Sequence, residues 1–329
     1  MEQIEIAIIG GGPCGLAVAV EAQKEGFNAV VFEKGTVAEN IRHFPTNMVF
    51  FSTADLLQIG DLPFTIPHPK PTRAEAVAYY QKVAQFYHLD VRTNTPIVNV
   101  QRTDNGFVLE DSIGRRYGSK YVVVATGYFE NPNKLNVPGE HLPFVKHRYE
   151  EALAYWGKRV VVVGGGNSAV EAALEIYRAG AKQVSIIHRR KEFSPSVKYW
   201  LKPDIENRIK EGSITAYMES TVKYFVPEGV VIQTPEGEKM IECDEVLVLI
   251  GYTPNIHLLK RFGVPVDEKT KTPLYNPETM ETPVEGLYVA GSVVCGCETG
   301  NIFIENGRLH ARIIVNHIKQ KHKGNKNFL

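Results

Sequence analysis

Residues 4–33, IEIAIIGGGPCGLAVAVEAQKEGFNAVVFE, decide the fold of this chain. An apolar run leads into the glycine turn GGGPCG, a segment with apolar residues at helical spacing follows as far as Gly26, and a second apolar run ends at Glu33. Short continuous runs of Val and Ile are typical of parallel strands buried on both faces, and a glycine often ends a helix. The stretch therefore predicts a strand, a tight turn, a helix and a second strand parallel to the first.

The same plan returns in residues 159–190, RVVVVGGGNSAVEAALEIYRAGAKQVSIIHRR. Two further apolar runs, YVVVATG at 121–127 and EVLVLIG at 245–251, fall where each repeated unit would close its sheet. A last strand is expected at 286–291, followed by a final helix over about 302–319. With 329 residues, the chain is long enough for about two domains.

We therefore predict an α/β protein with two Rossmann-type dinucleotide-binding domains of the three-layer ββα kind. The first domain is discontinuous and comprises residues 1–128 and 253–329, and the second comprises residues 129–252. Pro132 and Pro254 lie in the loops after the two closing runs, where the chain crosses between domains. Two such units far apart in the chain imply two nucleotide sites.

The first glycine turn has the pattern G-x-G-x-x-G. Its first glycine permits a tight turn, the second lets a pyrophosphate approach the backbone, and the third lets the helix pack on the strand. The start of the helix adds free N–H groups and a partial positive charge. Glu33 lies 23 residues after Gly10, where a carboxylate accepts the hydroxyls of a ribose, so we assign this site to FAD. The residues expected to bind FAD are Gly10, Gly12, Pro13, Gly15, Glu33, Lys34, Ala125, Thr126, Gly127, Gly291, Ser292, Asn301 and Ile302.

The second glycine turn has the variant pattern G-x-G-x-x-A, and its second strand ends in His-Arg-Arg instead of an acid. An acid would repel a ribose 2′-phosphate, whereas arginine grips a phosphate with two hydrogen bonds. This site should therefore prefer NADPH to NADH; the alternative is that Arg189 and Arg190 are an ordinary solvated basic surface. The residues expected to bind NADPH are Gly164, Gly166, Asn167, Ser168, Ala169, His188, Arg189 and Arg190.

The composition excludes several other classes of protein. Lys plus Arg equals Asp plus Glu at 37 each, so no bulk field attracts nucleic acid or an acidic membrane surface. No apolar run approaches the length of a membrane span, and the acidic N-terminus with its early glycines is unlike a signal peptide. The four cysteines are too few for a disulfide framework. We expect a cytoplasmic protein that binds no metal, nucleic acid or membrane.

The order of the motifs resembles that of the thioredoxin-reductase-like flavoprotein disulfide reductases over the whole chain. Thioredoxin reductases carry a redox CxxC pair after the second glycine turn, but this chain reads GGNSAVEAALEI there and has no cysteine. The segments GGGPCG, FFSTADLLQIG, ATGYFENPN, SPSVKYWLKP and IFIENGRLH are most similar to the bacillithiol disulfide reductase branch. That resemblance implies an FAD- and NADPH-dependent enzyme of redox homeostasis that reduces a small disulfide, bacillithiol disulfide, and forms a homo-oligomer, a dimer or a tetramer.

The branch carries a cysteine in the first glycine turn, matching Cys14, which makes Cys14 the candidate catalytic residue. A helix N-terminus can lower a thiol pKa and favour attack on a disulfide, although a small packing residue would also suit this position. The sequence GSVVCGC at 291–297 departs from the pattern, because the wider family often has Asp where Ser292 stands. Cys295 and Cys297 could relay electrons, bind a metal weakly or be inert.

Other electron acceptors are compatible with the same two nucleotide sites. An NADPH–ferredoxin or flavodoxin reductase would share the architecture, and a flavin monooxygenase-like enzyme also has an ATG strand end before a proline loop. A redox-sensing protein would bind the nucleotides without turnover. The basic, aromatic loop SPSVKYWLKP, with Lys198, Tyr199 and Lys202, suits either an anionic substrate or a lid over NADPH.

Overall fold

The computed structural model describes residues 1–297 and 300–326, with side chains described as far as residue 323. The chain divides into two compact units, one formed by residues 1–131 and 253–329 and the other by residues 132–252. The two connecting segments pair with each other as the short strands β7 (Asn131–Pro132) and β16 (Tyr252–Thr253). Each unit is described separately below.

The first unit is built on a seven-stranded sheet in the order β3-β2-β1-β6-β5-β4, with β17 also paired to β6. The strands β3, β2, β1, β6 and β17 are parallel to one another, whereas β5 runs antiparallel to both β6 and β4. The strands are β1 (Glu2–Ile9), β2 (Ala29–Phe32), β3 (Asp90–Arg92), β4 (Ile97–Thr103), β5 (Gly106–Asp111), β6 (Arg116–Val124) and β17 (Leu287–Val289).

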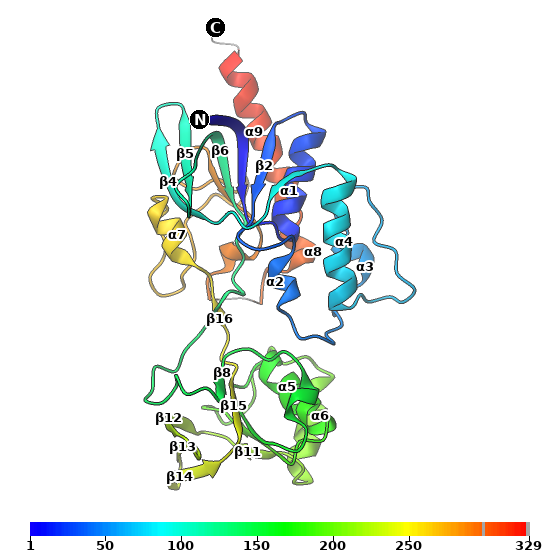
Figure 1. The fold of residues 1–329 in the computed structure, drawn as a ribbon, viewed down its shortest axis with the longest axis vertical. Helices are drawn as coiled ribbons and strands as arrows, with labels where there is room; N and C mark the ends of the chain where they lie inside the picture. Colours follow the sequence, from blue (N-terminus) through cyan, green and yellow to red (C-terminus); the bar gives the residue numbers. More distant parts are fainter. Residues whose placement is uncertain (298–299, 327–329) are drawn as a thin grey trace. The chain divides into compact units, whose positions relative to one another are not determined.

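The helix after the first glycine turn, α1, lies at the centre of this unit. Every residue from Gly15 to Val20 is buried, because α1 contacts the sheet on one side and α4 and α9 on others, as Figure 1 shows. The helix α9 buries Ala311, Ile314, Val315 and Ile318, which are spaced as one apolar stripe. The helical segments are α1 (Pro13–Lys24), α2 (Glu39–Arg42), α3 (Ala54–Leu57), α4 (Arg73–Phe86), α7 (Ile256–Arg261), η2 (Gly291–Cys295), α8 (Ile304–Gly307) and α9 (His310–Lys326).

The second unit has a parallel sheet in the order β11-β10-β9-β15-β8 and a separate antiparallel sheet, β12-β13-β14. The helix α5 follows β9 through the second glycine turn and buries an apolar face of alanines, Val170, Leu174 and Ile176. The elements are β8 (Val145–Lys146), η1 (Ala152–Tyr155), β9 (Arg159–Val163), α5 (Asn167–Arg178), β10 (Gln183–Ile187), α6 (Leu201–Lys210), β11 (Thr215–Tyr217), β12 (Thr221–Val226), β13 (Gly229–Thr234), β14 (Gly237–Glu242) and β15 (Glu245–Val248).

The predicted fold class, an α/β protein with parallel Rossmann-type sheets, is confirmed. The prediction of one final helix over 302–319 is wrong, since α8 ends at Gly307 and α9 begins at His310. The break lies at a tertiary contact: a Cβ at position 307 would lie 3.2 Å from Gly291 Cα, and His310 accepts a hydrogen bond from Gly291 N–H. These contacts hold the chain against η2 and interrupt the helix.

Candidate functional site

The first glycine turn is held between the ends of three strands. Gly10 N–H donates to Phe32 O at 2.9 Å, and a Cβ on Gly10 would lie 2.5 Å from Ala125 O. A Cβ on Gly15 would lie only 1.9 Å from Gly10 O, so the start of α1 closes directly onto the turn. Gly12, by contrast, faces open space and precedes Pro13 at the first position of α1. The turn therefore exposes the N-terminus of a 12-residue helix beside a position with room for a ligand.

Glu33 is buried beside this turn at the end of β2. Its Oε2 accepts a hydrogen bond from Gly11 N–H at 2.6 Å, and its Oε1 accepts one from Gly35 N–H at 2.8 Å. Burial raises the pKa of this carboxyl, and the two backbone hydrogen bonds oppose the rise. The adjacent Lys34 forms an ion pair with Glu130 at 2.6 Å. The carboxylate is thus oriented by the backbone and has further lone pairs for ligand hydroxyls.

On the other side of β1, the end of β6 and the start of η2 complete the same edge of the sheet. Ala125 N–H donates to Ile9 O, and Gly127 lies close to the side chain of Ser292. Thr126 Oγ1 is buried and has no hydrogen-bond partner within residues 1–297 and 300–326. The carboxyl ends of neighbouring parallel strands are where α/β sheets bind ligands, and an unpaired buried hydroxyl there suits a polar group of a cofactor.

Residues 301–310 reach this edge through α8. Asn306 Nδ2 donates to Asn301 O, and Asn306 Oδ1 accepts from Phe303 N–H, both at 2.8 Å. Ile302 packs against Gly307, which itself lies against Cys14. The structure therefore brings the predicted residues of the first site together at one edge.

The second glycine turn has the same construction with different chemistry. Gly164 N–H donates to Ile187 O at 2.9 Å, as Gly10 N–H does to Phe32 O, so His188 occupies the place that Glu33 has in the first site. A Cβ on Gly164 would lie 2.4 Å from Leu249 O, whereas Gly166 faces open space. Ala169 is buried at the position corresponding to Gly15, and Ser168 is exposed in the first turn of α5.

The imidazole of His188 lies flat against this turn. A Cβ on Gly165 would be 2.3 Å from its ring, and Phe193 stacks against the ring at 6.1 Å between centroids. Burial, followed by the charges of Arg190 and Arg189, lowers the pKa of His188, and its buried Nε2 has no partner in the described part of the chain. Arg189 and Arg190 are both exposed directly beyond it. A neutral imidazole and two guanidinium groups therefore replace the carboxylate of the first site.

The loop after β10 is tied to the second turn. Asn167 Nδ2 donates to Ser196 O and Asn167 Oδ1 accepts from Lys198 N–H, both at 2.9 Å, and Ser194 N–H donates to Gly165 O. Lys202, expected in this loop, instead lies in the first turn of α6. The loop thus forms a fixed wall beside the nucleotide turn, which the sequence pattern alone did not predict.

The surroundings of the cysteines in the structure determine the pKa of Cys14 and the exposure of Cys295 and Cys297. The Sγ of Cys14 packs against Gly291 and Gly307, and burial, with a smaller effect of nearby Cys295, raises its pKa to about 12. The expectation that the helix N-terminus lowers this pKa is therefore wrong for this structure. Cys295 is buried and Cys297 is exposed, so the two thiols of the CGC sequence face different surroundings.

A contact that sequence reasoning missed joins two segments far apart in the chain. Ser52 Oγ, which is buried, donates a hydrogen bond to Glu305 Oε1, 253 positions away. Arg308 Nη1 donates to Gln58 O in the same region. Nothing in the spacing of these residues signals the contact, because it depends on how α8 packs on α3.

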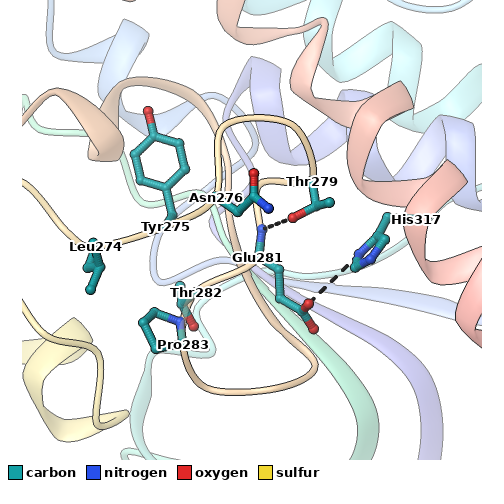
Figure 2. Close-up of a pocket in the computed structure, with 8 residues that line it drawn as sticks. All are labelled: Leu274, Tyr275, Asn276, Thr279, Glu281, Thr282, Pro283 and His317. Atoms are coloured by element: carbon teal, nitrogen blue, oxygen red, sulfur yellow. Dashed lines mark hydrogen bonds and ion pairs between the residues drawn. The ribbon is translucent and has the colours of Figure 1, made fainter.

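A cavity of about 340 Å³ lies elsewhere in the first unit. In Figure 2, Glu281 points toward His317, and the two side chains form an ion pair at 3.9 Å. Glu281 also accepts hydrogen bonds from Gly286 N–H and Lys321, and His317 Nδ1 bonds the hydroxyl of Tyr288. The polar groups of Glu281 and His317 thus bond other groups of the protein, and none of the predicted cofactor residues lines the cavity. Its lining residues are Leu274, Tyr275, Asn276, Thr279, Glu281, Thr282, Pro283 and His317.

Within residues 1–297 and 300–326, no three His, Cys, Asp or Glu side chains form a group able to hold a metal ion. The helices of this described part include none that is long and apolar enough to cross a membrane.

His310 makes a testable contribution to the pH dependence of stability. Its Nδ1 accepts the Gly291 N–H at 3.1 Å, and burial lowers its pKa, so the unfolded chain binds this proton more readily than the folded protein does. Stability should therefore fall once the pH drops through about 6.5, the ordinary histidine pKa, until it reaches the lower pKa of the folded state. His310→Asn keeps an acceptor without the titration.

We expect the thermal midpoint of the wild-type protein to fall between pH 7 and pH 5 by about 2–4 °C more than that of His310→Asn, corresponding to about 1 kcal/mol. Differential scanning fluorimetry at both pH values measures this difference. The exposed His141, replaced by Asn, serves as the control. An equal change in thermal midpoint between pH 7 and pH 5 in His310→Asn and the wild type would show that His310 does not cause the loss of stability.

Comparison with known proteins agrees with this geometry. The profile of a family described as pyridine nucleotide-disulphide oxidoreductase matches residues 7–291. The bacilliredoxin reductase Bdr of Bacillus subtilis is 40% identical over 323 residues, which cover 98% of this chain and 99% of that protein. The bacillithiol disulfide reductase Bdr of Staphylococcus aureus superposes with a TM-score of 0.93 at 37% identity, covering 98% of this chain and 99% of that one. The corresponding Bacillus cereus structure gives a TM-score of 0.94 at 38% identity, covering 97% and 100%.

These matches confirm the resemblance seen in the sequence, together with the prediction of an oxidoreductase that uses FAD and NADPH. The likeness extends through both units and both glycine turns, since the curated relative and the two solved structures are covered almost from end to end. The chain therefore belongs to the pyridine nucleotide-disulphide oxidoreductase family.

Proposed function

We propose that this protein is an NADPH-dependent flavoenzyme that reduces a low-molecular-weight disulfide, namely bacillithiol disulfide. The observation that carries the proposal is the pair of glycine turns with opposite chemistry, Glu33 beside one and His188, Arg189 and Arg190 beside the other. The relatives of nearly equal length whose names specify bacillithiol disulfide or bacilliredoxin support the choice of acceptor.

We assign FAD to residues 1–128 and 253–329, and NADPH to residues 129–252. The fit is supported by two glycines whose Cα faces open space, Gly12 and Gly166, and by two buried atoms without a partner in the described chain, Thr126 Oγ1 and His188 Nε2. At the two glycines a ligand would have room to approach the backbone, and at the two buried atoms it would supply the missing hydrogen-bond partner. When bound, FAD supplies the chemistry that takes a hydride from NADPH and delivers two electrons to a disulfide.

The protein's own residues bind and orient these groups. Glu33, oriented by Gly11 and Gly35, would accept hydrogen bonds from the ribose hydroxyls of FAD, and the N-terminus of α1 would face its pyrophosphate. Arg189 and Arg190 would hold the 2′-phosphate of NADPH. The other assigned residues lie in the two glycine turns, after β2, β6 and β10, in η2 and just before α8.

Disulfide reduction by purified protein tests this function directly. With NADPH and oxidised bacillithiol, we expect disulfide-dependent NADPH oxidation well above the rate with oxygen alone. Turnover with ferredoxin or flavodoxin, and none with the disulfide, would instead favour the NADPH–ferredoxin reductase activity.

The role of Cys14 is tested in the same assay. If Cys14 exchanges with the disulfide, Cys14→Ala should lower disulfide turnover by about 10³-fold while ferricyanide reduction by NADPH continues. If Cys14 only fills the space between Gly291 and Gly307, the same variant should lower turnover less than tenfold. The double variant Cys295→Ala, Cys297→Ala is the comparison, because those cysteines lie outside the glycine turn.

We further propose a cytoplasmic location and a homo-oligomer, a dimer or a tetramer. The location is supported by the need for NADPH and by the four cysteines, none of which is in a disulfide within the described residues. The oligomer is supported by the resemblance to the thioredoxin-reductase-like family, and light scattering of the purified protein measures it.

A further inference from the structure

An apolar surface surrounds the contact between α3 and α8 in the first unit. The helices α3 and α8 lie side by side (Figure 1). The apolar side chains around their contact are each between 39% and 52% exposed. At its centre, the rings of Phe51 and Phe303 meet edge to face, 5.4 Å apart. The other members come from the same segments: Leu56 belongs to α3, and Leu309 follows α8. Single exposed apolar residues are ordinary, whereas larger exposed apolar groups mark binding surfaces. This α3–α8 patch consists of Val49, Phe51, Leu56, Phe303 and Leu309.

Hydrogen bonds of neighbouring residues fix the backbone segments that carry the patch. Ser52, next to Phe51, donates to Glu305, and Arg308 donates through Nη1 to Gln58 O and through Nε to Glu305 O. Phe50 N–H also donates to Pro71 O at 2.9 Å. The two aromatic rings therefore sit on a backbone that is fixed from two sides, and such preorganisation favours the binding of a ligand.

The patch is continuous with the first cofactor site. Gly307, at the end of α8, packs against the Sγ of Cys14 and against Gly291. Ile302, which we assign to FAD, directly precedes Phe303. In the order β3-β2-β1-β6, Glu33 at the end of β2 lies on one side of β1, and Thr126 after β6 lies on the other. The helix α8 packs on η2, which follows β17, the strand paired with β6, so α8 lies on the Thr126 side. If Glu33 binds the adenosine ribose, the patch therefore lies toward the opposite, reacting end of the cofactor.

The size of the patch also indicates the kind of occupant. A stable protein interface needs about 20–30 residues from each partner, and the patch has five apolar side chains. A small molecule fits this scale. The chain has no CxxC pair to carry electrons to a distant surface, so a disulfide must come close to FAD or to Cys14. The Sγ of Cys14 lies against Gly307 of α8, and Ile302, which we assign to FAD, directly precedes Phe303. Sulfur atoms make favourable contacts with aromatic ring edges at about 5 Å.

We propose that the α3–α8 patch binds the low-molecular-weight disulfide substrate, and that Phe51 and Phe303 are substrate-binding residues that contact its sulfur atoms. This inference rests on the disulfide reductase activity proposed above. It adds the surface on which the substrate binds, which neither glycine turn specifies.

The double variant Phe51→Ala, Phe303→Ala tests this inference. We expect the KM for oxidised bacillithiol, and its Kd for the FAD-loaded protein in titration calorimetry without NADPH, to rise about tenfold or more. Phe303→Tyr, which keeps the ring, should retain KM and Kd near the wild-type values. The matched control is Phe86→Ala, because Phe86 is also exposed and also meets a neighbouring ring, Tyr87, edge to face at 5.0 Å. Flavin absorbance ensures that variants are compared at equal FAD content.

Unchanged KM and Kd in the double variant would overturn the proposal, as would an equal rise in Phe86→Ala. A change in solution mass in the double variant would also overturn it, since the patch would then be a subunit interface. If the wild-type protein neither binds nor reduces the disulfide, the proposed function itself fails and this inference fails with it.

Discussion

Replacing Gly12 with alanine should remove FAD from the protein without unfolding it, whereas replacing Gly166 should weaken NADPH and leave FAD in place. The reason is the open space at both positions: an added Cβ meets no atom within 4 Å, so the protein itself tolerates it. The same Cβ would occupy the space that a pyrophosphate needs to reach the backbone N–H groups. Loss of two charge-assisted hydrogen bonds, each worth about 1.5–3 kcal/mol, corresponds to a loss of affinity of about 100-fold or more.

Three measurements separate the two effects. The ratio of flavin to protein absorbance reports FAD, titration calorimetry reports NADPH, and thermal unfolding of the nucleotide-free protein reports the fold. Each variant is the control for the other, because both place the same methyl group at equivalent positions of the two turns. Gly12→Ala that keeps FAD but loses NADPH would reverse the assignment of the two units. Equal loss of both nucleotides in both variants would mean that the sites are not independent.

The second large effect is expected at the end of β10. Replacing Arg189 and Arg190 together with alanine should lower the preference for NADPH over NADH, measured as the ratio of kcat/KM values, by about 100-fold. Both guanidinium groups are exposed beyond the half-buried His188, and His188, not a carboxylate, stands at the position that Glu33 has in the first site. The change should raise the KM for NADPH and leave the KM for NADH nearly constant, because NADH has no 2′-phosphate.

Lys191→Ala is the matched control for this experiment. Lys191 is the next residue, is also exposed and carries the same charge, so its loss tests whether general electrostatic attraction explains the preference. We expect it to change the preference less than threefold. If the double arginine variant keeps its preference, Arg189 and Arg190 are the ordinary solvated surface that the sequence also allowed.

Much of the fold could be predicted because its defining features are local. A glycine turn between an apolar run and a helical segment specifies a strand–turn–helix unit within about 30 residues, and the acid or base at the second strand end follows at a nearly constant distance. The structure then shows why particular positions require glycine. Gly15 cannot carry a Cβ, which would lie 1.9 Å from Gly10 O, and Gly10 adopts a φ of +114°.

Other features could not be predicted, because they depend on segments that meet only in three dimensions. The last helix breaks where Gly307 and His310 contact Gly291, a residue that precedes them by 16 and 19 positions and lies beyond the last strand. Burial between Gly291 and Gly307 reverses the pKa shift expected for Cys14 at a helix N-terminus.

The sequence by itself therefore determined that two glycine turns each join a strand to a helix, where these turns lie in the chain, and whether an acid or basic residues follow the second strand of each unit. These properties reside in short stretches whose backbone geometry and charge are set by the residues within them. Only the tertiary structure decided that the Sγ of Cys14 packs against two distant glycines and that Cys295 and Cys297 differ in exposure. It also decided that the loop of Phe51 packs on α8 beside the first turn. The physical reason is that burial and side-chain contact depend on residues more than 200 positions away in the chain. A short stretch of sequence does not indicate which of these distant residues will pack against it.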